Sequence, residues 1–186
     1  MAGSRAAAMA ADGLTLGRGV LALVIGTLAA RGQPGGAAVA LSAAWFSDAL
    51  DGRVARASGR RTRLGEWDMP ADTLVGAALL AGLWAEGTVP PWLAGGILLI
   101  FGGGYVLLRQ AALGMVVQAV GYGAFLGHLW STGQGILWVP VVAALLIGAL
   151  DRRKLFRVLI PAFLGGLGDA LRLRRGSRLG PPADPR

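Results

Sequence analysis

The sequence predicts an all-helical integral membrane protein with six transmembrane helices. Three observations lead to this fold class. Of the 186 residues, 54% are hydrophobic and only 15% are charged, and the mean hydropathy is +0.58. Apolar stretches of about 20 residues, the length that crosses a bilayer as a helix, recur along the chain. Arginines and tryptophans are distributed over the intervening loops as the two sides of a membrane require.

Turn-forming residues separate most of the apolar segments. Such residues occupy 31–35 after the first segment, 87–91 after the third and 131–135 after the fifth. The boundary at Arg109 has no turn-forming run, so the loop there must be short. Pro70 suits the first turn of the third helix better than a helix interior. The predicted spans are residues 14–30, 36–55, 70–86, 90–108, 111–130 and 135–150.

The basic residues predict that both termini are cytoplasmic. With the N-terminus inside, the outer loops contain only Arg31, whereas the inner loops hold a cluster of basic residues. This asymmetry is what the positive-inside rule requires. The outer loops are also flanked by Trp84, Trp92, Trp130 and Trp138, as an interfacial aromatic belt would be. The basic residues of the inner loops are Arg53, Arg56, Arg60, Arg61, Arg63, Arg109, Arg152, Arg153, Lys154 and Arg157.

A single membrane domain is expected between two cytoplasmic segments. The N-terminal segment is 1–13, the six-span domain is 14–150, and the basic C-terminal segment is 151–186. No small-residue cleavage site follows the first apolar run, so we expect a retained span and not a signal peptide. Residues 155–170 are apolar but interrupted by charges and a proline. We expect them to form a helix or loop on the membrane surface, not a seventh span.

Composition excludes several kinds of site. The chain has no cysteine, which excludes disulfides, thiol catalysis and thiolate metal sites. Its one histidine, His128, excludes a histidine-rich metal site and is expected near the outer face, away from any catalytic group. The net charge of +8 is typical of nucleic-acid-binding proteins. In a membrane protein it reflects orientation and anionic head groups instead, so we expect membrane lipids and no nucleic acid as partners.

Four aspartates lie where the second and third spans meet their cytoplasmic loop. Asp48 and Asp51 are three residues apart, and Asp68 and Asp72 are four apart, so each pair shares one helix face. Carboxylates close to lipid are unfavourable and usually functional. Clustered carboxylates repel one another unless cations neutralise them, and oxygen ligands favour Mg²⁺, Mn²⁺ or Ca²⁺. The alternative is a salt-bridge network between these aspartates and the loop arginines.

Two neighbouring residues suit phosphate binding. Gly52 directly follows Asp51 and would let a ligand approach the backbone closely. Arg56 lies one helical turn beyond Gly52 and could place a guanidinium near phosphates that metal ions hold.

This segment resembles the signature of the CDP-alcohol phosphatidyltransferase family. That signature has two aspartates three apart, a glycine, Ala-Arg, an eight-residue spacer, a second glycine, and two aspartates four apart. The chain departs from it by one residue, since two residues instead of three separate Gly65 from Asp68. The run from Leu14 to Arg18 also resembles the Leu-Thr-x-x-Arg opening of the family's first span. The matching signature residues are Asp48, Asp51, Gly52, Ala55, Arg56, Gly65, Asp68 and Asp72.

The resemblance implies an enzyme of phospholipid biosynthesis. It would transfer a phosphatidyl or similar phospho-alcohol group from a CDP-linked lipid, such as CDP-diacylglycerol, to an alcohol acceptor and release CMP. It also implies a homodimer. The arginine distribution predicts that the active site faces the cytoplasm, and we expect the membrane to be a bacterial cell (inner) membrane. Two Mg²⁺ or Mn²⁺ ions would be bound by Asp48, Asp51, Asp68 and Asp72, with Asp72 also acting as the general base. The residues implied at the CDP site are Gly52, Ala55, Arg56, Gly65, Thr15 and Arg18.

The acceptor is not identified by these motifs. Arg109 lies at the inner end of the fourth span, level with the aspartates, and is the candidate acceptor contact. Its alternative interpretation is a lone arginine that extends to the membrane surface. Glycerol phosphate, inositol phosphate, serine and another phospholipid all remain open as acceptors.

The competing interpretation is a non-enzymatic membrane protein. It would be a transporter, or a degenerate family member that binds only metal or nucleotide. Transporters tend to place ionisable residues near the bilayer midplane, between inverted repeats. Here the aspartates lie at one membrane edge and no such repeat is visible, which favours the enzyme.

Overall fold

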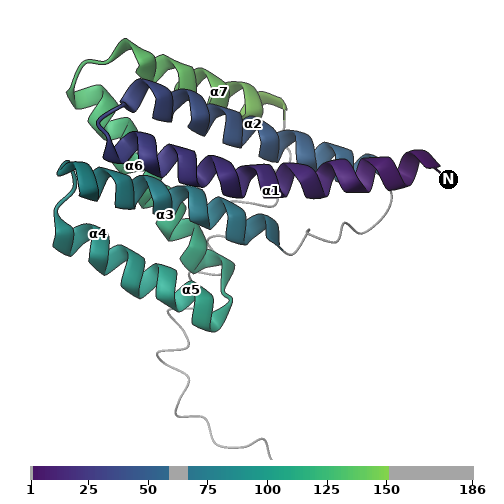
Figure 1. The fold of residues 1–186 in the computed structure, drawn as a ribbon, viewed down its shortest axis with the longest axis horizontal. Helices are drawn as coiled ribbons and strands as arrows, with labels where there is room; N and C mark the ends of the chain where they lie inside the picture. The colour runs from purple at the N-terminus through teal and green to yellow at the C-terminus, as the bar shows by residue number, and fades with distance from the viewer. Residues whose placement is uncertain (1, 59–66, 151–186) are drawn as a thin grey trace, which may run out of the picture.

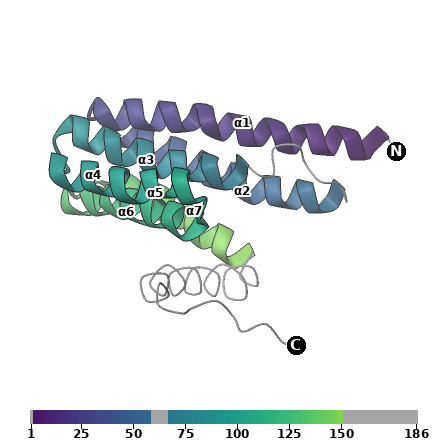
Figure 2. The same ribbon diagram turned by 90° about the horizontal axis from the view of Figure 1, so that it is seen from below.

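The computed structural model describes residues 2–58 and 67–150, with side chains described for 13–50, 67 and 69–150. Regular structure in this part of the chain is helical, without strands. The helices run back and forth, so that most neighbours are antiparallel (Figures 1 and 2). They are α1 (Ala2–Ala30), α2 (Pro34–Ser58), α3 (Asp68–Glu86), α4 (Pro91–Ile97), a π-helical turn (Leu98–Gly102), α5 (Gly103–Leu108), α6 (Ala111–Ser131), a 3₁₀ turn (Gly135–Leu137) and α7 (Trp138–Leu150).

Each predicted apolar segment lies in helical structure. The fourth, predicted as 90–108, is one helical run from Pro91 to Leu108 that comprises α4, the π-helical turn and α5. The all-helical class is therefore confirmed for the described residues. The complete set of six spans and the orientation of the termini stay predictions, and residues 155–170 lie outside the described part. The helices long and apolar enough to cross a membrane are Gly13–Ala30, Pro91–Leu108 and Ala111–Ser131, with Gly135–Leu150 shorter.

Three tight turns lie at one end of the bundle, opposite the N-terminus of α1 (Figures 1 and 2). Each contains a glycine with a positive φ: Gly32 at 62°, Gly87 at 92° and Gly133 at 67°. The chain closes each turn with a backbone bond to the preceding helix, as from the Gln33 N–H to the Leu28 carbonyl at 2.9 Å. Glycine adopts this left-handed conformation without the strain of a Cβ. These are the turns that the sequence assigns to the outer side.

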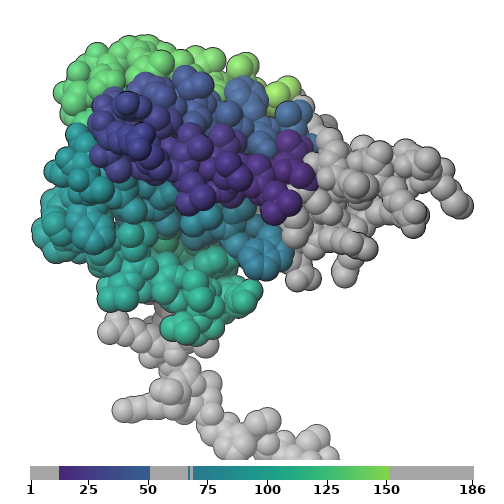
Figure 3. Space-filling view, in the orientation of Figure 1, coloured from purple at the N-terminus to yellow at the C-terminus, as the bar shows by residue number. Residues whose placement is uncertain are grey.

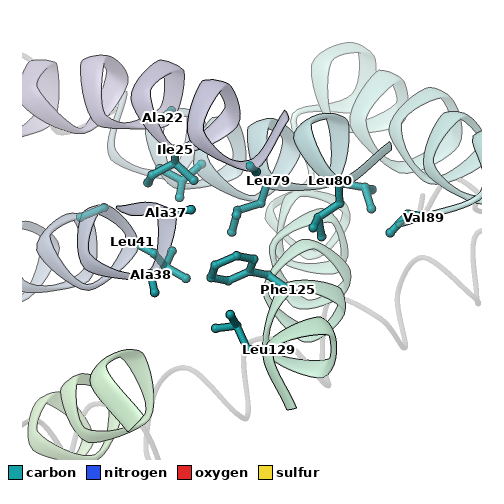
Figure 4. Close-up of a cluster of buried hydrophobic side chains, with 14 of the residues drawn as sticks. Ala22, Ile25, Ala37, Ala38, Leu41, Leu79, Leu80, Val89, Phe125 and Leu129 are labelled. Carbon is teal, nitrogen blue, oxygen red and sulfur yellow. The ribbon is translucent and has the colours of Figure 1, made fainter. Parts of the chain in front are cut away.

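Helix α1 lies across the middle of the face seen in the space-filling view (Figure 3). It packs along α2 and α3, while α3 also packs on α6, and α2 on α7. Ile25 of α1, Leu41 of α2, Leu79 of α3 and Phe125 of α6 are fully buried where these helices meet (Figure 4). Much of the remaining core is alanine, which lets the helices approach closely.

Glycines make the closest helix crossings. A Cβ added at Gly121 of α6 would overlap the carbonyl oxygen of Gly76 of α3. A Cβ at Gly82 of α3 would lie 2.6 Å from the carbonyl oxygen of Gly26 of α1. Helix α3 therefore contacts α6 and α1 backbone to backbone, an arrangement typical of membrane helices.

The outer surface of the bundle is apolar. Leu23 of α1 is 68% exposed, Leu99 of the π-helical turn 78%, and Leu107 of α5 83%. Large apolar side chains with this much exposure occur on several helices, as expected where a protein contacts a membrane or a partner. The surface agrees with a membrane protein.

Candidate functional site

A buried ion cluster joins the first three helices. Arg18 of α1 has no exposed surface, and its Nη1 donates to Oδ1 of Asp48 in α2 at 2.7 Å and to Oδ1 of Asp72 in α3 at 2.6 Å. The side chains of Asp48 and Asp72 are 35% and 26% exposed. One nitrogen atom thus joins two partly exposed carboxylates that are far apart in the sequence.

The helical period of α1 places Arg18 in this position. Buried residues recur along α1 at intervals of three and four, which defines the face that packs against α2 and α3. Arg18 belongs to this face, so its guanidinium must enter the bundle. A buried charge is tolerated only when it is paired, because removing it from water costs several kcal/mol. The residues of this face are Thr15, Arg18, Ala22, Ile25 and Ala29.

Helix α6 supplies further polar contacts beside Asp72. The Tyr122 hydroxyl donates to the Asp72 carbonyl oxygen at 3.4 Å. Its ring meets that of Trp45 in α2 edge to face, with centroids 5.2 Å apart. One turn earlier, Nε2 of Gln118 donates to Oγ1 of Thr73 at 3.4 Å. These contacts tie the turn that carries Asp72 to α6 and α2.

Gln118, Tyr122 and Trp45 were not predicted from the sequence. Gln118 and Tyr122 are four residues apart, and so share one face of an apolar helix. Polar side chains inside membrane helices commonly form hydrogen bonds to neighbouring helices. The spacing of Gln118 and Tyr122 was therefore the sequence signal that could have identified the contribution of α6 to the site.

Two cavities adjoin the ion cluster. One of about 280 Å³ lies between α1 and the start of α3, with a mostly apolar lining. Another of about 250 Å³ lies between α2 and α7 and includes Asp48 and Trp45 in its wall. Asp48 can therefore be approached from between α2 and α7. The first cavity is lined by Thr15, Leu16, Gly19, Trp67, Pro70, Ala71 and Leu74.

The structure brings together two of the four predicted metal ligands. Asp48 and Asp72 meet at Nη1 of Arg18. Asp51 lies in α2, one turn after Asp48, and Asp68 begins α3, one turn before Asp72. The side chains of Asp51 and Asp68 lie outside the described residues, so the complete four-carboxylate site stays a prediction.

The predicted CDP-site residues divide in the same way. Thr15 and Arg18 are buried on the face of α1 that meets the two aspartates, and Thr15 also lines the apolar cavity. The positions predicted on α2 lie in its final turns, without described side chains, and Gly65 lies outside the described residues. The α2 positions are Gly52, Ala55 and Arg56.

The described carboxylates fit a hard divalent cation. Nη1 of Arg18 is a cationic nitrogen that contacts one oxygen of Asp48 and one of Asp72, so the two carboxylates lie close enough to share a cation. Carboxylate oxygens are the donors that Mg²⁺ and Mn²⁺ prefer. Among the described residues no group of three acidic, histidine or cysteine side chains gathers. The side chains of Asp51 and Asp68 are not among the described ones.

Arg109 lies at the same end of the bundle as Asp72. It ends α5 in a left-handed conformation with φ of 53°, and its N–H donates to the Tyr105 carbonyl at 2.8 Å. A Cβ added at Gly114 of α6 would lie 3.3 Å from the Tyr105 ring and 2.6 Å from Oγ1 of Thr73. Tyr105 and Thr73 thus flank the same point on α6, which places the end of α5 near the start of α3.

His128 lies elsewhere. It occupies the last turn of α6, beside the turn that contains Gly133. That turn is at the opposite end of the bundle from the N-terminus of α3 (Figure 1). The expectation that His128 is remote from the aspartates agrees with this position.

Comparison with known families now defines the class of protein. The family model of CDP-alcohol phosphatidyltransferase matches residues 8–164, which is most of the chain. No curated protein and no solved structure shows a significant match. The chain belongs to the CDP-alcohol phosphatidyltransferase family, as its motif indicated.

Family membership supports a transferase of lipid synthesis. Its members transfer a phospho-alcohol group from a CDP-alcohol and commonly use divalent metals. The apolar helices agree with the membrane location of such an enzyme. The family match covers α1, α2 and α3, the helices that carry the ion cluster.

Proposed function

We propose that this protein transfers a phosphatidyl or related group from a CDP-linked lipid, such as CDP-diacylglycerol, to an alcohol acceptor and releases CMP. The observation that best supports this reaction is the meeting of Asp48 and Asp72 on one cationic nitrogen, beside an apolar cavity. Carboxylates in this arrangement can hold cations that bind a pyrophosphate. The apolar cavity suits an acyl chain of the same substrate.

Different residues of the chain would bind the metal ions, accept the proton and orient the base. Asp48, Asp51, Asp68 and Asp72 would hold two Mg²⁺ or Mn²⁺ ions, which supply charge neutralisation for the pyrophosphate and the departing CMP. Asp72 also takes the proton of the acceptor hydroxyl. The acceptor oxygen bonds to phosphorus as the bond from phosphorus to the CMP oxygen breaks. Tyr122, which bonds the Asp72 backbone carbonyl, orients the turn that carries this base.

The proposed location follows from the same residues. A site at the cytoplasmic edge of a bacterial inner membrane receives CDP and acceptor from water while acyl chains stay in lipid. The arginine-rich loops favour this orientation, with both termini inside. The CDP moiety would bind near Thr15, Arg18 and the end of α2. A homodimer is proposed by analogy with the family.

The reaction is tested by measuring CMP release by the purified protein in mixed micelles of detergent and lipid. CDP-diacylglycerol is supplied with Mg²⁺ or Mn²⁺ and, in turn, glycerol phosphate, inositol phosphate, serine or a phospholipid. We expect CMP to appear only when both metal and one acceptor are present, and mass spectrometry to identify the lipid product. If no acceptor and neither metal gave CMP, a non-enzymatic role would be favoured instead.

Arg109 is proposed to contact the acceptor, and Arg109→Gly separates that role from a structural one. Glycine adopts the left-handed conformation freely, so we expect a stability equal to wild type or higher by about 1 kcal/mol. Loss of the guanidinium should raise KM for an anionic acceptor about tenfold, the loss of one charge-assisted contact. Thermal unfolding and acceptor titration measure the two effects.

The control for Arg109→Gly is Arg31→Gln. Arg31 is exposed and lies in the turn between α1 and α2. That turn is at the end of the bundle opposite the N-terminus of α1 (Figure 1). We expect this variant to keep the KM of wild type. An unchanged KM in Arg109→Gly would remove Arg109 from the acceptor site and leave it as a surface arginine.

A further inference from the structure

Arg18 occupies the point at which a cation bridging Asp48 and Asp72 would bind. Its Nη1 lies 2.7 Å from Oδ1 of the first aspartate and 2.6 Å from Oδ1 of the second. The guanidinium has no exposed surface, whereas both carboxylates are partly exposed. The arginine thus contacts the carboxylates from a buried position, and each carboxylate side chain keeps part of its surface exposed.

We propose that Arg18 is an internal cation that competes with the metal ions for Asp48 and Asp72. In the metal-free protein it neutralises the two carboxylates and holds α1, α2 and α3 together. Binding of a divalent ion to the same oxygens requires Nη1 to move away. The inference rests on the proposed function, because it assumes that these aspartates bind metal.

The geometry makes the two states exclusive at these oxygens. Mg²⁺ binds carboxylate oxygens at about 2.0–2.1 Å, closer than the guanidinium nitrogen now lies. An ion that bridged the two Oδ1 atoms would stand at the place of Nη1, and two cations cannot share it because like charges repel strongly in a medium of low dielectric constant. Release of the two oxygens requires a change of rotamer in the long arginine side chain.

The displaced guanidinium needs a new partner, since an unpaired buried charge is unfavourable. A pyrophosphate held by the metal ions offers anionic oxygens in the same place, and guanidinium groups bind phosphate oxygens well. Arg18 would then move from carboxylate to phosphate as substrate arrives. The same residue would be a counter-ion to the carboxylates before substrate binds and a phosphate ligand afterwards.

Mn²⁺ binding by Arg18→Gln tests the competition without measuring turnover. In wild type, Mn²⁺ can bind only to those molecules in which Arg18 has released the two carboxylates. The smaller this fraction is, the weaker the apparent affinity for Mn²⁺. We expect Arg18→Gln to melt at a lower temperature than wild type in a chelator. We also expect it to bind Mn²⁺ about tenfold more tightly or better, as measured by electron paramagnetic resonance of the free ion. Mn²⁺ should recover most of the lost melting temperature. Arg31→Gln, which removes an exposed arginine, should match wild type in both respects.

A second measurement on the wild-type protein does not depend on a variant that folds. The guanidinium of a buried arginine exchanges its protons slowly enough to be observed by ¹⁵N nuclear magnetic resonance, and Arg18→Lys assigns the signal. We expect Mg²⁺ to shift the Arg18 signal and CDP to shift it again.

The outcomes separate this inference from the proposed function. Mn²⁺ that bound to wild type and to Arg18→Gln equally, or more weakly to the variant, would overturn the competition and leave the metal site intact. The competition would also be overturned if Mg²⁺ bound to the protein and the Arg18 signal did not shift. Failure of both proteins to bind Mn²⁺ would overturn the competition together with the proposed metal site.

Discussion

Asp72→Asn is expected to release CMP at least about 100-fold more slowly than wild type, as is usual when a positioned general base is lost. The amide cannot accept the proton of the acceptor hydroxyl and is a weaker metal ligand than a carboxylate. The loss should appear in kcat and not only in KM, because proton transfer belongs to the transition state. The measurement is initial CMP release at saturating CDP-diacylglycerol and acceptor.

Folding must be checked beside the activity of Asp72→Asn. Arg18 loses one carboxylate partner in this variant but keeps Asp48 at 2.7 Å, so we expect a lower melting temperature and a folded protein. Glu86→Gln is the matched control, because Glu86 ends the same helix, α3, and is exposed. Asp72→Asn with the turnover of wild type would contradict the assigned base, whatever its stability.

Gly121→Ala is expected to destabilise the bundle most among single methyl additions in α6. The new Cβ would overlap the carbonyl oxygen of Gly76, which belongs to the backbone of α3 and cannot rotate away. Helices α3 and α6 must then move apart, and overpacking of this kind costs about 1–3 kcal/mol. Since α3 carries Asp72, we expect activity to fall together with stability.

Gly123→Ala supplies the control in the same helix. A Cβ at Gly123 would meet nothing within 4 Å, so its effect is the intrinsic gain of alanine over glycine in a helix, up to about 1 kcal/mol. Thermal unfolding of both variants in the same detergent compares them directly. Equal melting temperatures would show that the α3–α6 crossing relaxes without loss.

The helices were predictable because their ends are marked by chemistry that acts locally. Gly32, Gly87 and Gly133 occupy turns that require positive φ, and each lies in a polar or proline-containing run. The π-helical turn at Leu98–Gly102 was not predicted. It lies in a run without proline between two groups of glycines, 95–96 and 102–104, and these glycines by themselves do not specify a change of helical pitch.

The aspartates of the site could be predicted from the sequence, whereas their contacts with other residues could not. Spacings of three and four residues place aspartates on one face of a helix, so Asp48 and Asp72 could be selected from the sequence. Their shared contact is Arg18, which is 30 residues from one and 54 from the other, and only the packing of three helices reveals it. The Tyr122 and Trp45 contacts depend on the crossing of α6 and α2 in the same way.

The three residues of the ion cluster are synthesised at different times, which affects when the cluster can form. Arg18 emerges from the ribosome before either of its carboxylate partners, and the second partner belongs to α3. The charge of α1 therefore cannot be fully compensated until α3 has followed it. A nascent chain that stops after α1 therefore lacks both partners of Arg18, and the ion cluster is complete only when α3 has packed against α1.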